Sequence, residues 1–106
     1  MDERAREARA ADQRESIAER REQIRKFTRA AVEGERQADY WEWSLEFNEY
    51  QLRAHLEIKG NVAKMRDATA DIRRNVAAIA DRLVSEQAEL DKLTRPTLLE
   101  RIRQLF

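Results

Sequence analysis

The chain has 106 residues, of which 40% are charged, 7% are aromatic and none is cysteine. This length allows one domain or one long coiled coil, and the lack of cysteine excludes disulfides, thiolate nucleophiles and cysteine-ligated metals. The 21 acidic and 21 basic side chains cancel, which argues against the strong positive field of a duplex-binding protein. With two glycines and one proline, the sequence has too few turn residues for a many-stranded fold, so we expect an all-α protein.

The first predicted element is a long helix. Residues 1–13 alternate Arg, Glu and Ala, and we expect them to form a solvated helix end without a partner helix. Further on, apolar residues recur at every seventh position, which is typical of the seam, the apolar line along which two coiled helices touch. These positions are Ile17, Ile24, Ala31, Ala38, Leu45 and Leu52. Because this spacing passes through Gly34 without a slip, we predict one helix over residues 14–58.

A tight turn is predicted at residues 59–61. Gly60 and Asn61 both tolerate the positive φ angles that close a reversal between two helices. A turn at this point would place Leu45 opposite Val76, and Gly34 opposite Glu86. Residues 31–58 hold seven acids and two arginines, whereas residues 59–106 hold ten basic side chains and seven acids. We therefore expect the two helices to attract each other.

The second predicted helix covers residues 62–94 and has the clearest periodic pattern in the chain. Steps of three and four residues connect ten positions, nine of which suit a seam. They are Val62, Met65, Thr69, Ile72, Val76, Ile79, Leu83, Glu86, Leu90 and Leu93. Thr94 and Pro96 then indicate a new helix start, so we expect a short C-terminal helix over residues 97–106. The predicted fold is an antiparallel helical hairpin, a coiled coil, over residues 14–106.

A second apolar stripe on the first helix exceeds what a hairpin needs. It consists of Tyr40, Trp43, Phe47 and Tyr50, and lies roughly 160° around the helix from the seam at 100° per residue. An apolar patch of this size is larger than monomeric proteins usually expose, so we expect another protein surface to cover it. We interpret these four residues as a partner-binding face for self-association, as in a homodimer, or for docking a partner helix. The alternative is a compact three-helix bundle, in which Gly34 is a turn and the stripe is core.

The most direct functional interpretation is a non-catalytic structural or protein-interaction module. A monomeric three-helix-bundle adaptor is the alternative. A nucleic-acid accessory protein is a weaker one, because the first 30 residues hold eight arginines but carry a net charge of only +2. We expect no enzyme activity, since the sequence has no Gly-rich phosphate loop and no Ser/His/Asp set.

The sequence also predicts no cofactor, no metal site and no membrane span. His55 is the one histidine, and it has no second histidine with which to form a helical-bundle metal site. The longest apolar run, residues 76–80, is far below the length of a membrane span. The N-terminus carries acids among its arginines, unlike a signal or transit peptide. We therefore expect a soluble, cytoplasmic protein without cofactor or metal.

Overall fold

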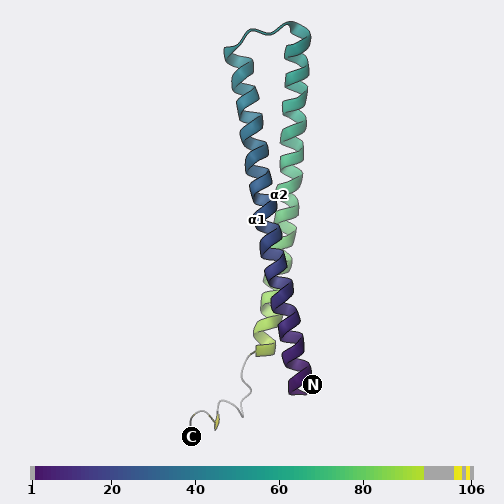
Figure 1. Cartoon of the computed structure of the whole chain (residues 1–106), viewed down its shortest axis with the longest axis vertical. Helices are drawn as coiled ribbons and strands as arrows, with labels where there is room; N and C mark the ends of the chain where they lie inside the picture. Colours follow the sequence, from purple (N-terminus) through teal and green to yellow (C-terminus); the bar gives the residue numbers. More distant parts are fainter. Residues whose placement is uncertain (1, 95–101, 104, 106) are drawn as a thin grey trace.

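The computed structural model, which describes residues 2–94, 102–103 and 105, is an antiparallel hairpin of two long helices (Figure 1). Helix α1 spans Glu3–Phe47 and helix α2 spans Leu52–Thr94. The radius of gyration is 23.6 Å, whereas a compact domain of this length has about 13 Å. The predicted all-α hairpin is confirmed. The three-helix bundle is wrong, because α1 continues through Gly34.

The turn lies at residues 48–51 and not at the predicted 59–61. Gly60 is inside α2, and no described residue has a positive φ. Helix α1 ends because Asn48 adopts an extended backbone, while its N–H and its side-chain amide both donate to the Ser44 carbonyl, at 2.9 and 3.2 Å. The hydroxyls of Ser44 and Tyr50 share a hydrogen bond of 2.6 Å. Side-chain hydrogen bonds to Ser44 therefore hold the turn, without the conformational freedom of glycine.

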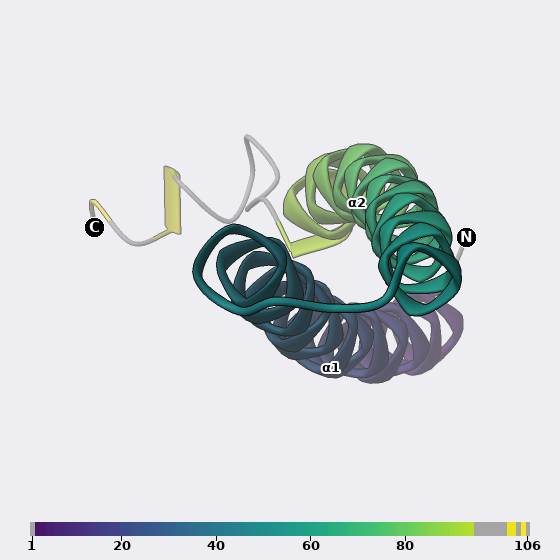
Figure 2. The same ribbon diagram turned by 90° about the horizontal axis from the view of Figure 1, so that it is seen from above.

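The seam follows the predicted seven-residue period in both helices. Its buried members are Ala10, Ile17, Ala31 and Ala38 on α1, and Val62, Thr69 and Leu90 on α2. A strict seven-residue repeat makes two helices coil around each other. Accordingly, α1 and α2 change sides between the turn and the N-terminus, and each follows an arc when viewed from above (Figures 1 and 2).

The earlier turn changes which residues face each other across the seam. Gly34 lies against Thr69 and not against Glu86. The Glu86 carboxylate instead accepts hydrogen bonds from Arg20 Nε at 2.5 Å and from Ser16 Oγ at 3.1 Å. The predicted alignment of the two helices is therefore wrong, although the residues assigned to the seam are largely right. Leu52 is an exception, because it begins α2 and is 74% exposed.

The N-terminal end of α1 has a partner helix, contrary to the expectation of a solvated end over residues 1–13. Ala10 is 5% exposed and forms a buried cluster with Ile17 and Leu90. The Gln13 side-chain amide also donates to the Glu89 carboxylate at 2.8 Å. Because the turn comes early, α2 is long enough to cover this end of α1. The predicted helix over residues 97–106 lies mostly outside the described residues.

Ion pairs connect the helices at three levels of the hairpin. They join Arg20 to Glu86, Arg73 to Glu35, and Arg66 to both Asp39 and Glu42, at distances of 2.5–3.0 Å. An arginine hydrogen bond stabilises the charged form of Glu35, Glu42 and Glu86, so the pKa values of these three carboxyl groups lie below the usual 4.5. Opposite charges at these positions add a small preference for this alignment of the helices, because ion pairs between exposed side chains are weak.

Acid should therefore destabilise the hairpin. A carboxylate whose pKa is lower in the folded state stabilises that state above its unfolded pKa, and this contribution is lost as pH falls through the folded value. We expect the melting temperature followed by circular dichroism to be level from pH 7 to about 5.5 and to fall below about 4.5. Replacing Glu35, Glu42 and Glu86 together by Gln should lower the melting temperature at pH 7 and reduce its fall in acid.

A matched control uses three other glutamates that are exposed on the described helices. Glu15, Glu19 and Glu57 make no ion pair with the opposite helix in the described part of the chain. Their joint replacement by Gln should leave the acid dependence as it is in the natural sequence. An equally steep fall in both triple variants would contradict the role assigned to the interhelical pairs.

Candidate protein-interaction surface

Three aromatic side chains form a continuous exposed line on the outer side of α1. Tyr40, Trp43 and Phe47 are 55%, 53% and 64% exposed. Their rings contact one another along the helix, with centroids 6.2 Å apart for Tyr40 and Trp43 and 5.4 Å apart for Trp43 and Phe47. We call these three residues the aromatic surface. Side chains three and four positions apart lie on one side of a helix, so α1 itself holds them in line.

The aromatic surface is separate from the seam. Ala38 is 1% exposed, and Trp41 and Leu45 are half-buried between the helices. Trp41 meets Tyr40 edge-on, with ring centroids 5.3 Å apart. Helix α1 therefore buries one apolar side against α2 and leaves the other in solvent, where a contiguous aromatic line is typical of a binding site.

Tyr50 differs from the other three predicted site residues. It lies in the turn, after α1 has ended, and so it does not extend their helical line. Its side chain is less exposed, at 37%, and its hydroxyl is engaged with Ser44. The structure brings Tyr40, Trp43 and Phe47 together and gives Tyr50 a structural contact in the turn.

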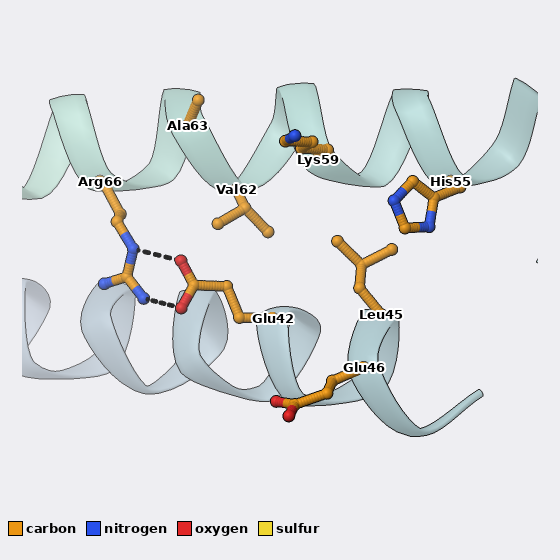
Figure 3. Close-up of a pocket in the computed structure, with 8 residues that line it drawn as sticks. All are labelled: Glu42, Leu45, Glu46, His55, Lys59, Val62, Ala63 and Arg66. Atoms are coloured by element: carbon orange, nitrogen blue, oxygen red, sulfur yellow. Dashed lines mark hydrogen bonds and ion pairs between the residues drawn. The ribbon is translucent and has the colours of Figure 1, made fainter. Parts of the chain in front are cut away.

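An open groove of about 520 Å³ lies between the helices close to the turn (Figure 3). Leu45 and Val62 point toward each other in its apolar part. Across it, Glu42 and Arg66 form a two-pronged ion pair with distances of 2.8 and 2.7 Å. Hydrogen bonding lowers the pKa of Glu42 and raises that of Arg66, so both groups stay charged near neutral pH. This ion pair therefore joins α1 to α2 across the groove.

His55 lines this groove from the first turns of α2. The predicted helix over residues 14–58 contains His55, whereas in the structure this residue belongs to α2. Among the residues that the structure describes, no cluster of His, Asp and Glu side chains could hold a metal ion. Neither described helix has a stretch that is long and apolar enough to cross a membrane.

Sequence reasoning missed Ser44 and the groove. Ser44 is 3% exposed and holds the turn, but a single serine beside a heptad position gives no signal by itself. The groove depends on where the chain reverses. Gly60 led to a predicted turn at residues 59–61, whereas the turn lies at residues 48–51. Asn48 was the available signal, because asparagine often stops a helix by hydrogen bonding to nearby backbone groups.

Comparisons with known proteins add no family assignment. No protein-family model, curated protein or solved structure matches the chain.

Proposed function

We propose that the protein is a non-catalytic structural module that self-associates through the aromatic surface of α1. The observation that carries this proposal is the contiguous exposure of Tyr40, Trp43 and Phe47 on a helix whose opposite side is already packed. Three rings in line offer a rigid, apolar contact, and aromatic residues are enriched in the central contacts of protein interfaces.

The small amount of buried apolar surface supports an assembly. Among the described residues, six hydrophobic side chains are buried, and no large side chain is fully buried. The chain exposes 8763 Å², whereas a compact monomer of 12.6 kDa exposes about 6200 Å². A second copy packed on α1 would remove part of this excess from water and supply the burial that a two-helix hairpin lacks.

The test removes the aromatic surface without touching the seam. Trp43→Ala combined with Phe47→Ala should convert a dimer of about 25 kDa, measured by light scattering or sedimentation, into a monomer of 12.6 kDa. Helicity by circular dichroism should be unchanged, because both side chains are more than half exposed. We expect at least a tenfold weaker association, since each ring contributes about 1 kcal/mol or more.

The matched control removes two exposed apolar side chains from α2. Leu56 and Val84 are 57% and 71% exposed, so Leu56→Ala with Val84→Ala deletes comparable surface elsewhere. This variant should remain dimeric. A monomeric natural chain at every concentration would contradict self-association, and loss of helicity in the aromatic variant would place Trp43 and Phe47 in the core of the fold.

A further inference from the structure

The charges of α1 are divided between two segments. Residues 20–30 hold five basic side chains and one acidic one, whereas residues 31–49 hold six acidic side chains and one basic one. The aromatic surface lies within the acidic segment. Two copies of α1 in parallel would place like charges side by side, while two antiparallel copies would place each basic segment along the acidic segment of the other.

The outer side of α1 also carries exposed side chains that the hairpin leaves unused. Val32 is 43% exposed and lies about 20° from Trp43 around the helix at 100° per residue. Lys26 and Arg29 are exposed, and neither makes an ion pair with any residue that the structure describes. These three residues precede Tyr40 by about two to four helical turns and continue the line of the aromatic surface toward the N-terminus.

We propose that two copies of this chain pair through antiparallel α1 helices, with the two-fold axis near Arg36. This proposal rests on the self-association proposed above and specifies its geometry. The occupant of each aromatic surface is then the segment containing Lys26, Arg29 and Val32 of the other copy. That segment is a second binding surface, distinct from the aromatic surface on the same helix.

An axis at Arg36 places three residues of the acidic segment opposite residues of complementary chemistry, and it places the two Arg36 side chains opposite each other. At equal distances from the axis, Trp43 meets Arg29 of the second copy, an aromatic ring against a guanidinium cation. Tyr40 meets Val32, which pairs two apolar side chains. Glu46 then meets Lys26 in a pair of opposite charge. In a two-fold interface each contact occurs twice, so these three pairs give six contacts.

The interface is long enough for a stable dimer. From residue 25 to residue 47, α1 extends about 33 Å at 1.5 Å per residue. Aromatic side chains cover roughly 150–250 Å² each, and about half of that area is exposed in Tyr40, Trp43 and Phe47. The three rings thus contribute roughly 300 Å² per copy toward the roughly 800 Å² per partner of a standard interface. Val32 and the aliphatic parts of the basic side chains add to this area.

Charge reversal tests the pairing. One variant carries Lys26→Glu with Arg29→Glu, and a second carries Glu46→Lys with Glu49→Lys. All four residues are exposed, so circular dichroism should show an unchanged helix content. Each variant alone should dissociate at concentrations where the natural chain is a dimer, with at least a tenfold weaker association. A one-to-one mixture should restore a species of about 25 kDa, twice the mass of 12.6 kDa, because both contacts between positions 26 and 46 then join opposite charges again.

Cysteine cross-linking tests the direction independently, because the natural chain has no cysteine. Arg36→Cys should form a disulfide-linked dimer with itself on oxidation, since the two copies meet at the axis. Glu46→Cys should not link to itself but should link to Lys26→Cys in a mixture.

The outcomes separate this geometry from self-association as such. A dimer that survives both charge reversals, or that links Glu46→Cys to itself, would overturn the antiparallel pairing while self-association through the aromatic surface stands. A natural chain that stays monomeric would overturn the proposed function as well.

Discussion

Replacing Ile17 by Ala should lower the free energy of unfolding by about 3 kcal/mol, one of the two largest effects that we expect in this molecule. Ile17 is 4% exposed and lies in the cluster with Ala10 and Leu90, against which Leu83 and Leu93 also pack. The substitution removes buried methyl groups and leaves a cavity between two helices that have few other large buried side chains. The melting temperature should fall by roughly 15 °C, as followed by circular dichroism.

Val84→Ala is the matched control for this substitution. Val84 is an aliphatic residue of similar size, but it is 71% exposed on α2, so its removal should change stability by less than about 0.5 kcal/mol. All proteins should be compared at one concentration, because self-association would add to the apparent stability. If Ile17→Ala proved as mild as the control, the N-terminal part of α1 would not be packed against α2.

Gly34→Ala should destabilise the hairpin even though alanine is the better helix former. A Cβ atom at Gly34 would lie 2.5 Å from Thr69 Oγ1, which is too close for two atoms in contact. Thr69 cannot move freely, because it is 5% exposed and its hydroxyl donates to the Met65 carbonyl at 2.8 Å. We expect the steric cost to exceed the helix-propensity gain of about 1 kcal/mol and to leave a net loss of about 1–2 kcal/mol.

A double-mutant cycle identifies the contact responsible. Thr69→Ala removes the hydroxyl that the new methyl group would meet, so Gly34→Ala should become stabilising in that background. The coupling between the two sites should be about 2 kcal/mol in chemical denaturation. Additive effects of the two substitutions would show that the helices do not approach closely at this level.

Gly60→Ala provides the matched comparison for Gly34→Ala. Gly60 also lies inside a helix, but a Cβ there would meet nothing within 4 Å, so the same substitution should stabilise the hairpin by about 1 kcal/mol. If Gly60 were instead the turn residue that the sequence predicted, with a positive φ, alanine would be strained and the protein would be less stable. The sign of this change therefore tests the position of the turn.

The candidate surface was predictable where it depends on one helix. Tyr40, Trp43 and Phe47 share one side of α1 because of their spacing, and their separation from the seam follows from the same geometry. The same spacing groups Tyr50 with them only if the helix continues past Asn48. Its contact with Ser44 arises because the chain leaves the helix at Asn48, which the spacing of apolar residues does not encode.

The sequence by itself determined the fold class, the continuity of α1 past Gly34 and most of the seam. These features follow from the seven-residue period, which is a local property that persists wherever the helix finds its partner. The tertiary structure alone decided where the chain reverses and which residues face each other. The apolar stripes of two helices can pack together in several alignments that bury similar apolar area. Specific contacts between residues distant in the sequence therefore decide which alignment forms. Here Thr69 packs against Gly34, and the Glu86 carboxylate accepts a hydrogen bond from Arg20. The hydrogen bond between the hydroxyls of Ser44 and Tyr50 stabilises the turn.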